Sequence, residues 1–303
     1  MKKISVILTT YNGSKTIERT LNSIFSQDGL KSDFELEVLV IDDQSTDNTT
    51  SIIEKFPVKL LVNDKNSGGP NKGRNLGLSI VTGDYICIVD QDDEWLPNRI
   101  STVLPYLNQT MIISSGFIVK DTLTDTVKEI VNDASTDFIL FDKNKTFMQR
   151  LEKSSKGQNT YLGSLIYHSS LKHILFEEDF GMVDFDWLLK LFHNQSSVEI
   201  CKPLYIRYLD GKNLSMNEKY RQNDYTFSMK TIETYKNTYP KQSKSALKKV
   251  NGTLARYYYV TGNMKEARFY FKKSTINLKT ILYLITSFFG SKYIIKKFPV
   301  FGN

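Results

Sequence analysis

The sequence predicts an α/β fold, a mostly parallel central sheet with helices on both faces, followed by a C-terminal all-helical extension. Over the first hundred residues, short β-branched runs alternate with segments of helical spacing, which is the pattern of a parallel sheet. Polar and acidic residues follow these runs, at the edge where such sheets bind ligands. From Glu218 onward the pattern is helical. The predicted strands of the first part are residues 4–10, 36–41, 58–62 and 84–89.

The composition is that of an ordinary globular protein, because 40% of the 303 residues are apolar and 24% are charged. This mix excludes an intrinsically disordered chain, a collagen-like repeat and a disulfide scaffold. No apolar run reaches the ~20 residues that a membrane-spanning helix needs. The two cysteines, Cys87 and Cys201, lie far apart in the sequence. We therefore expect both to be reduced and buried, as in a cytoplasmic protein.

The net charge of +7 hides an asymmetry along the chain. Residues 1–200 contain 20 Lys/Arg and 28 Asp/Glu, a net charge of −8, whereas residues 201–303 contain 20 and 5, a net charge of +15. An acidic front could hold a metal, and a basic back could meet an anionic partner. Within the back, Gly262 and Ala267 predict a helical hairpin. The segment 275–303 could lie on a membrane surface or pack against the main domain.

The strongest chemical signal is an acidic motif at the end of the last predicted strand, Asp90-Gln91-Asp92-Asp93. Hard divalent cations such as Mg²⁺ and Mn²⁺ prefer oxygen ligands, commonly one or two carboxylates together with the phosphates of a substrate. Three carboxylates within four residues repel one another unless a cation or hydrogen-bond donors offset their charge. The motif therefore indicates a divalent metal site.

A second acidic pair, Asp42-Asp43, follows the second predicted strand. At such a strand end, a carboxylate can accept hydrogen bonds from a nucleobase or from ribose hydroxyls. The same segment also offers helix caps, since Ser45 and Asp47 precede the next predicted helix. We expect both uses, with Asp43 facing a ligand and Asp47 capping the helix.

A glycine-rich loop, Asn66-Ser-Gly-Gly-Pro-Asn-Lys-Gly-Arg-Asn-Leu-Gly77, opens the third predicted helix. Two of its glycines have the spacing of a P-loop, but Arg74-Asn75 stand where that motif has Lys and Ser or Thr. The loop is therefore not a P-loop. A glycine loop that carries Lys72 and Arg74 into a helix N-terminus can still bind a diphosphate.

Taken in order, the segments SVILTTYNG, VIDDQSTDNT, GGPNKGRNLG and VDQDDEWLPNRI resemble glycosyltransferase family 2, over roughly residues 1–200. The resemblance implies the GT-A fold and a transfer of sugar, with inversion, from a nucleotide diphosphate sugar. It implies a catalytic domain over residues 1–215, with nucleotide-sugar binding in 1–110 and the acceptor side in 111–215. Residues 216–303 would form the basic helical region.

Carried over by position, the resemblance assigns the metal to Asp92, the nucleobase contact to Asp43 and the ribose contact to Asp90. Arg74 matches an arginine that lies near the nucleotide or the sugar in this family. The expected nucleotide-sugar-binding residues are Thr10, Tyr11, Asp43, Lys72, Arg74, Asp90 and Gln91. The implied cofactor is a divalent metal, Mn²⁺ or Mg²⁺, and the expected donor is a UDP-sugar.

The catalytic base of the family lies in an acidic pair that opens a helix after the acceptor loop. Residues 181–189, GMVDFDWLL, match that helix and place Asp184 at the base position, but Val183 replaces the preceding acid. The alternatives for this role are Asp186, Glu178 and Asp179. Inversion requires one carboxylate to deprotonate the acceptor hydroxyl on the face opposite the leaving diphosphate. The structural alternative is an ordinary capped amphipathic helix, with Trp187 facing the core.

A second departure from the family lies in residues 205–215, where a histidine is common and this chain has none. Arg207 or Lys212 could contact the diphosphate instead. Trp95 and Tyr161 could stack on an acceptor sugar, although packing is the more common role of such side chains.

These observations predict an inverting, metal-dependent glycosyltransferase of the hexosyl- or N-acetylhexosaminyltransferase class. Its acceptor would be a glycan or a lipid-linked acceptor in surface polysaccharide or lipooligosaccharide synthesis, in the cytoplasm or at the inner face of the cell membrane. Two rival interpretations are a non-catalytic or nucleic-acid-binding basic protein and a nucleotidyltransferase on a similar sheet. The first leaves the four motifs unexplained, and the second lacks the phosphate loop. We expect no nucleic-acid partner.

Overall fold

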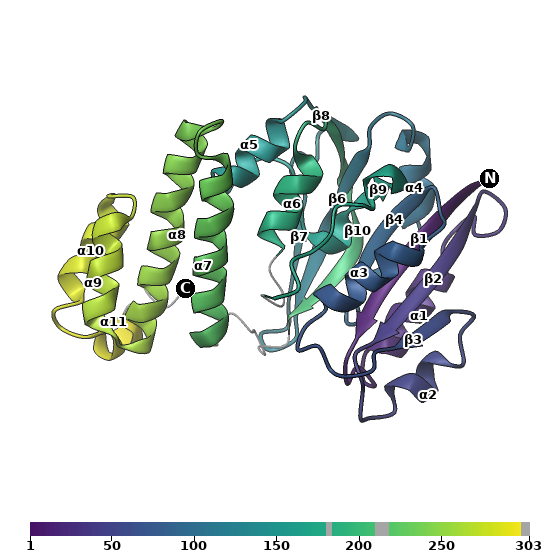
Figure 1. Ribbon diagram of the computed structural model, residues 1–303, viewed down its shortest axis with the longest axis horizontal. Coiled ribbons are helices and arrows are strands. Elements are labelled where there is room, and N and C mark those ends of the chain that lie inside the picture. The colour runs from purple at the N-terminus through teal and green to yellow at the C-terminus, as the bar shows by residue number, and fades with distance from the viewer. Residues whose placement is uncertain (180–183, 210–217, 298–303) are drawn as a thin grey trace. The chain divides into compact units, whose positions relative to one another are not determined.

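The chain divides into two units, one built on a sheet and one helical (Figure 1). The computed structural model describes residues 1–179, 184–209 and 218–297. The first unit consists of Met1–Phe147 and Lys156–Lys212, and the second consists of Met148–Ser155 and Asn213–Asn303.

In the described residues, the first unit contains one ten-stranded sheet with the order β3-β2-β1-β4-β9-β6-β10-β5, while β7 pairs with β6 and β8 with β10. The strands are β1 (Lys2–Thr10), β2 (Phe34–Asp42), β3 (Lys59–Val62), β4 (Tyr85–Asp90), β5 (Glu94–Trp95), β6 (Ile112–Asp121), β7 (Thr126–Ile130), β8 (Phe138–Phe141), β9 (Ile166–His168) and β10 (Ser197–Leu209). The α-helices are α1 (Ile17–Phe25), α2 (Thr49–Ile53), α3 (Asn71–Ile80), α4 (Arg99–Val103) and α6 (Phe185–Phe192), while α5 (Lys145–Leu151) begins in this unit and ends in the second. Short 3₁₀ turns lie at Leu104–Tyr106, Leu162–Ser164 and Ser169–Leu171.

Strands β1 to β4 form a parallel set, which confirms the α/β fold that the sequence predicts. In the register of the sheet, Thr10 of β1 pairs with Asp42 of β2, and Thr9 of β1 pairs with Asp90 of β4. The carboxyl ends of these strands therefore meet at one edge, and both acidic motifs lie there. In the other half of the sheet β10 is parallel to β6, whereas β5, β7, β8 and β9 run antiparallel to their partners.

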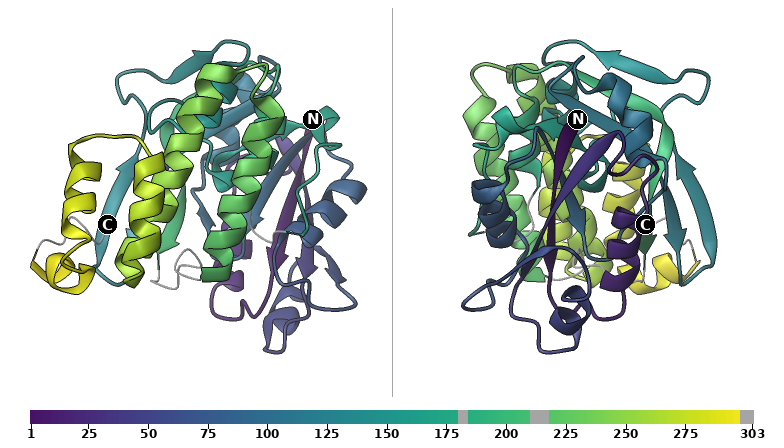
Figure 2. Two further views of the ribbon diagram at one scale, coloured as in Figure 1. Left: turned by 60° about the vertical axis from the view of Figure 1, so that its left-hand side comes forward. Right: turned by 90° about the vertical axis from the view of Figure 1, so that its right-hand side faces the viewer.

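Helices α1 and α3 cover opposite faces of the parallel strands (Figure 2). On one face, Ile17 and its apolar neighbours on α1 share the main core with β1. On the other face α3 lies so close that a Cβ on Gly73 would come within 2.9 Å of Thr9, and one on Gly77 within 2.6 Å of Ile7. Because both faces are covered, β1 is buried along nearly its whole length, as is typical of a parallel sheet.

The second unit is a series of helices whose short connections include a glycine turn. Gly262 ends α8 in the left-handed conformation with φ 90°, and the side chain of Asn263 caps α9 by accepting a hydrogen bond from the Glu266 amide. Ala267 is fully buried on α9. The predicted helical hairpin is therefore confirmed. The helices are α7 (Glu218–Tyr235), α8 (Pro240–Thr261), α9 (Met264–Lys273), α10 (Leu278–Thr286) and α11 (Ser291–Lys297).

Aromatic rings form the small core of this helical unit. The ring of Tyr283 on α10 stacks on Phe271 of α9, with centres 5.0 Å apart, and meets Tyr259 of α8 edge-on at 4.9 Å. These contacts attach α10 to the hairpin. Among the described helices, none has both the length and the apolar character that a bilayer crossing requires.

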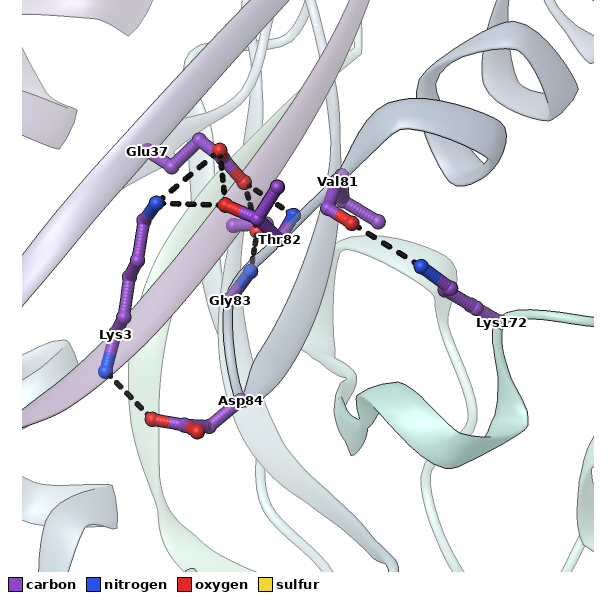
Figure 3. Close-up of polar contacts among 8 residues, drawn as sticks. Lys3, Glu37, Val81, Thr82, Gly83, Asp84 and Lys172 are labelled. Atoms are coloured by element: carbon purple, nitrogen blue, oxygen red, sulfur yellow. Dashed lines mark hydrogen bonds and ion pairs between the residues drawn. The ribbon is translucent and has the colours of Figure 1, made fainter.

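A polar network surrounds Glu37 of β2, near the amino ends of the parallel strands (Figure 3). The carboxylate accepts hydrogen bonds from Ser5 Oγ at 2.5 Å, from the Thr82 amide at 2.8 Å and from Thr82 Oγ1 at 2.6 Å. Lys3 Nζ lies 3.3 Å from it. Burial alone would raise the pKa of Glu37, but these donors lower it to about 2. The network thus ties β1, β2 and the start of β4 together.

We expect Glu37→Gln to destabilise the fold at neutral pH and to have less effect in acid. The pKa of Glu37 is lowered to about 2 in the folded chain, from an ordinary value of 4.5 that applies to the unfolded chain. Its contribution to stability is therefore complete above the unfolded pKa and is lost as the pH falls toward 2. Urea unfolding of both proteins at about pH 7 and about pH 3 measures the difference. Glu35→Gln, at an exposed position of the same strand, is the control. An equal loss of stability at both pH values would contradict the assignment.

Candidate functional site

The acidic motif forms a tight turn after β4, and helix α1 holds its backbone. The Asp93 amide donates to the carbonyl of Asp90 at 3.2 Å. Thr20 Oγ1 lies 2.8 Å from the carbonyl oxygen of Gln91 and 2.7 Å from that of Asp93. Arg19 Nη2 donates to the carbonyl of Asp92 at 2.8 Å. Three consecutive carbonyl groups of the turn therefore bind two adjacent residues of α1, a role that the sequence pattern did not indicate.

The carboxylates of this turn lie in different environments. Asp92 is exposed, Asp90 is partly exposed, and Asp93 is 2% exposed. Burial raises the pKa of Asp93 well above its ordinary value, and the neighbouring charges of Asp90 and Asp92 raise it further, against the opposing effect of Arg207 and Arg99. The raised pKa of Asp93 is the expected result of burying a carboxyl group beside two other carboxylates.

Gln91 joins the turn to the carboxyl end of β1. Its Oε1 accepts hydrogen bonds from Thr10 Oγ1 at 2.6 Å and from the Tyr11 amide at 2.9 Å, and its Nε2 donates to the Tyr11 carbonyl at 3.3 Å. The Tyr11 side chain is 47% exposed. Three residues predicted to bind a nucleotide sugar are therefore adjacent in space.

The segment that follows β2 places Asp47 and Asp43 in different hydrogen-bond surroundings. Asp47 accepts hydrogen bonds from the Thr49 amide at 3.1 Å and the Ser14 amide at 3.2 Å. Burial raises the pKa of Asp47, but the hydrogen bonds from Thr49 and Ser14 together lower it to about 2. The N-cap residue of α2 is Asn48, whose side chain makes no capping bond, and Asp47 binds the first turn from one position earlier. Asp43 lies at the sheet edge and accepts from Asn63 Nδ2 at 2.7 Å and from the Ser67 amide at 3.0 Å. These bonds fix the direction of the Asp43 carboxylate.

Arg74 lies at the centre of the site. Its side chain is almost completely buried on α3. Nη2 contacts Asp90 Oδ1 at 2.8 Å, and Nη1 contacts Asp184 Oδ1 and Asn71 Oδ1, each at 3.1 Å. Burial opposes the charge, but the coulombic effects of Asp90 and Asp184 raise the pKa of Arg74. One guanidinium therefore joins the glycine loop, the end of β4 and the start of α6.

Asp184 occupies the N-cap position of α6, yet its side chain makes no capping hydrogen bond and instead contacts Arg74. Its side chain is 37% exposed. The net effect of the surroundings is to raise the pKa of Asp184. Desolvation is the largest cause and the charge of Asp90 adds to it, whereas Arg74 lowers the pKa. Trp187 packs in the core, as the helix pattern predicts. Val183, the departure from the family pattern, lies outside the described residues.

The three alternative carboxylates have other surroundings. Asp186 forms an ion pair with Lys190 at 2.5 Å on the same helix. Glu178 accepts a hydrogen bond from Asn75 Nδ2 at 2.8 Å, and Asp179 is exposed. Among these acids and Asp184, the contact with Arg74 is made by Asp184.

A cavity of about 390 Å³ lies beside the glycine loop. The exposed side chain of Lys72 lines it, facing the same space as Glu178 and Asp179. The structure therefore brings this predicted cation to an open space at the sheet edge. The remaining lining residues are Lys65, Asn66, Ser67, Gly69 and Asn71.

Tyr161 and Arg207 approach the acidic turn from the other half of the sheet. The Arg207 guanidinium lies 4.5 Å from the ring centre of Tyr161. Burial raises the pKa of the Tyr161 hydroxyl, and the negative charges of Asp90 and Asp93 raise it further. The hydroxyl therefore lies close enough to the acidic turn to interact with its carboxylates. Trp95 is 3% exposed and packs in the core. Lys212, the alternative to Arg207, lies outside the described residues.

The donor set fits a divalent cation that a substrate helps to bind. Among the described residues, no group of three or more His, Cys, Asp or Glu side chains is placed to hold a metal by itself. Asp92 nevertheless presents an exposed carboxylate. Mg²⁺ usually takes one or two protein carboxylates and completes its shell with substrate phosphates and water. Asp92 can supply such a ligand.

The sequence comparison decides the family. The model of "Glycosyl transferase family 2" matches residues 5–175, more than half of the chain. The chain belongs to glycosyl transferase family 2. The matched region includes the acidic turn, Asp43 and Arg74, whereas Asp184 lies just beyond it.

Two curated relatives illustrate how much of this family 2 chain resembles known proteins. It is 46% identical over 97 residues to the poly(ribitol-phosphate) beta-N-acetylglucosaminyltransferase TarS of Staphylococcus aureus, which is 31% of this chain and 17% of TarS. It is 33% identical over 114 residues to the GalNAc(5)-diNAcBac-PP-undecaprenol beta-1,3-glucosyltransferase of Campylobacter jejuni, 36% of each chain. The chain thus matches well under half the length of either relative.

Solved structures of TarS share the fold of this family 2 chain. The crystal structure of S. aureus TarS 1-349 in complex with UDP-GlcNAc matches with a TM-score of 0.63 and 21% identity, over 94% of this chain and 79% of that chain. The complex with UDP matches with a TM-score of 0.62, over 94% and 78%. Together these matches confirm the predicted GT-A architecture with C-terminal helices.

We expect Thr20→Val to lower the free energy of unfolding by about 1–3 kcal/mol, because the change removes the hydroxyl donor that lies between two carbonyl groups of the turn. Threonine and valine side chains have nearly the same shape, so the change in stability measures the contribution of the hydroxyl. Urea unfolding measures it, and Thr102→Val, at a half-buried helical threonine, is the matched control. Equal stabilities of the two variants would show that α1 does not hold the turn through this hydroxyl.

Proposed function

We propose that this chain is an inverting, metal-dependent glycosyltransferase. It moves a hexosyl or N-acetylhexosaminyl group from a UDP-sugar to a hydroxyl of a glycan or lipid-linked acceptor, in surface polysaccharide or lipooligosaccharide synthesis. The observation that carries the proposal is the meeting of Asp90, Arg74 and Asp184 beside the acidic turn, at the sheet edge where α/β proteins bind ligands. The names of the relatives support transfer of an N-acetylglucosaminyl or glucosyl group, and the TarS complexes with UDP and UDP-GlcNAc support a uridine donor.

In the proposed donor complex, the fixed carboxylate of Asp43 accepts a hydrogen bond from the nucleobase. Asp90 accepts hydrogen bonds from the ribose, while Thr10, Tyr11 and Gln91 line the nucleotide pocket. Lys72 and Arg74 face the diphosphate, since a glycine loop with cations at a helix start suits phosphate oxygens. Arg207, within the stretch where the family often has a histidine, would add a further positive charge.

We assign the divalent cation, Mn²⁺ or Mg²⁺, to Asp92. When bound, such a cation offsets the negative charge that develops on the departing diphosphate. Arg19 fixes the backbone that presents this carboxylate, because it donates to the carbonyl of the same residue. The protein's own contribution at this point is therefore the orientation of one exposed carboxylate.

Asp184 is the proposed general base. It would take the proton of the acceptor hydroxyl as that oxygen attacks the anomeric carbon on the face opposite the diphosphate. Desolvation raises the proton affinity of Asp184, and the ion pair with Arg74 opposes it and fixes the direction of the carboxylate. A base in this position must be held in place and remain partly open to the acceptor, and a 37% exposed side chain meets both requirements.

The proposed division of labour follows the chain. Residues 1–110 bind the nucleotide sugar, residues 111–215 form the acceptor side, and residues 216–303 are a basic helical region. We place the enzyme in the cytoplasm, because Cys87 and Cys201 are both free and buried. A lipid-linked acceptor would bring it to the inner face of the cell membrane.

A donor screen tests the class of reaction. Purified chain is mixed with UDP-, GDP- and TDP-sugars, with and without Mn²⁺, and released nucleoside diphosphate is measured. We expect slow, metal-dependent release of UDP from one UDP-sugar. Release of pyrophosphate would instead indicate a nucleotidyltransferase, and no binding of any nucleotide would indicate a non-catalytic protein.

We expect Asp92→Ala to abolish the stimulation of donor turnover by divalent cations, because the exposed carboxylate supplies the protein ligand. A titration of UDP release against Mn²⁺ measures the change. The control is Asp125→Ala, which removes a carboxylate from a surface turn between β6 and β7. Full transfer by the Asp92 variant with no divalent cation added would refute the metal assignment.

We expect Asp184→Asn to retain donor binding while transfer falls by about 10²–10⁴, the scale for loss of a general base. Calorimetry with UDP-sugar and the rate of transfer to acceptor separate the two effects. Asp186→Asn is the matched control, since that carboxylate pairs with Lys190 on the same helix. If Asp184→Asn transferred sugar at nearly the original rate, the base would have to be Asp186, Glu178 or Asp179.

A further inference from the structure

Helix α10 and the turn after it expose a stripe of large apolar side chains. Leu278 is 74% exposed, Ile285 54%, Phe288 73% and Phe289 77%. Ile281 and Leu282 are about two-fifths exposed. Positions 278, 281, 282 and 285 recur at helical spacing on α10, so they share one face, and Phe288 and Phe289 follow in the turn directly after the helix. A contiguous apolar patch of this kind marks an interaction surface, whereas scattered exposed residues do not.

The opposite face of α10 is firmly packed. Tyr283 is 1% exposed, and Ser287 is 2% exposed. Tyr259 Oη donates to Thr286 Oγ1 at 2.8 Å, and Arg268 Nη1 donates to the carbonyl of Ser287 at 3.0 Å. Figures 1 and 2 show α10 beside α9 in the helical unit. The stripe is therefore the outer face of an anchored helix, and its exposure is part of the folded unit.

From residue 267 onward the charged residues of the sequence have one sign, and the preceding acid is Glu266 in the first turn of α9. Residues 267–303 contain seven Lys or Arg and no Asp or Glu. Lys279 lies on α10 itself and is exposed, as are the lysines of the neighbouring helices. Those exposed neighbours are Lys272, Lys273, Lys292 and Lys296.

We infer that this stripe and its lysines form a docking surface for an anionic lipid bilayer, with α10 lying in the plane of the headgroups. Apolar side chains flanked by Lys and Arg are the composition of interfacial helices. Nine residues of α10 cannot span a bilayer, which takes ~20. Two copies meeting through this face would bring the same cations together, and like charges oppose that contact. Every residue of this surface lies in the helical unit, so the surface does not depend on the proposed sugar transfer.

Flotation of the full chain with lipid vesicles tests the surface. We expect binding to vesicles of phosphatidylcholine mixed with phosphatidylglycerol, weak binding to phosphatidylcholine alone, and a decrease as salt is added. The double variant Phe288→Ser, Phe289→Ser should lower the partition coefficient at least about tenfold, the scale of burying one large apolar side chain. Leu123→Ser removes a 70% exposed apolar residue from the sheet unit and is the matched control.

A second variant separates charge from apolar burial. Lys292→Glu, Lys296→Glu should weaken binding to the anionic vesicles while leaving the thermal unfolding of the chain unchanged, because both side chains are exposed. UDP release by all variants without vesicles should equal that of the original chain. This control distinguishes a loss of membrane binding from a defect in the donor site. The inference is overturned if the anionic vesicles do not bind the chain or bind the phenylalanine variant equally. A self-association in sedimentation that this variant abolishes would also overturn it, in favour of a second copy.

Discussion

The buried guanidinium of Arg74 is the constraint on which the candidate site depends. A cation that is 3% exposed has lost most of its hydration, and only nearby negative charge offsets the cost. Asp90 and Asp184 supply that charge from two segments far apart in sequence, and Asn71 adds an acceptor. The end of β4 and the start of α6 are thus drawn to one point. Any movement of either segment would leave a buried charge without its partner.

Differences in environment also explain how three aspartates can lie close together in the acidic turn. Asp90 is balanced by Arg74, Asp93 is buried where its pKa is raised, and Asp92 remains at the surface. The three neighbouring carboxylates therefore lie in three different environments. The exposed one is the carboxylate that we propose as the ligand of a divalent cation. Helix α1 fixes the geometry of this arrangement, because Thr20 and Arg19 bind the carbonyl groups of the turn.

Local patterns were sufficient to predict the parallel strands and both acidic motifs, since strand signals and turn residues act over a few positions. The pairing of Arg74 with Asp184 joins residues 110 positions apart and depends on the folded sheet. Family resemblance pointed to Asp184, but only the structure shows what holds it. The sequence did not predict the role of Thr20, because a single threonine in a helix does not show which distant backbone groups its hydroxyl will contact. The spacing of apolar residues also could not predict that one face of α10 is exposed, since buried and exposed apolar stripes have the same period.

The glycine-rich segment shows how one motif can serve packing and charge placement together. A Cβ on Gly73 would lie 2.9 Å from Thr9 and 3.2 Å from Ile41, so any larger residue would lift α3 from the sheet. The next residue is Arg74, and its reach to Asp90 is set by that close approach. Gly73, one of the two glycines with the spacing of a phosphate loop, therefore has a packing role here. It lets α3 lie close to two strands, so that the buried guanidinium of Arg74 reaches the acidic end of β4.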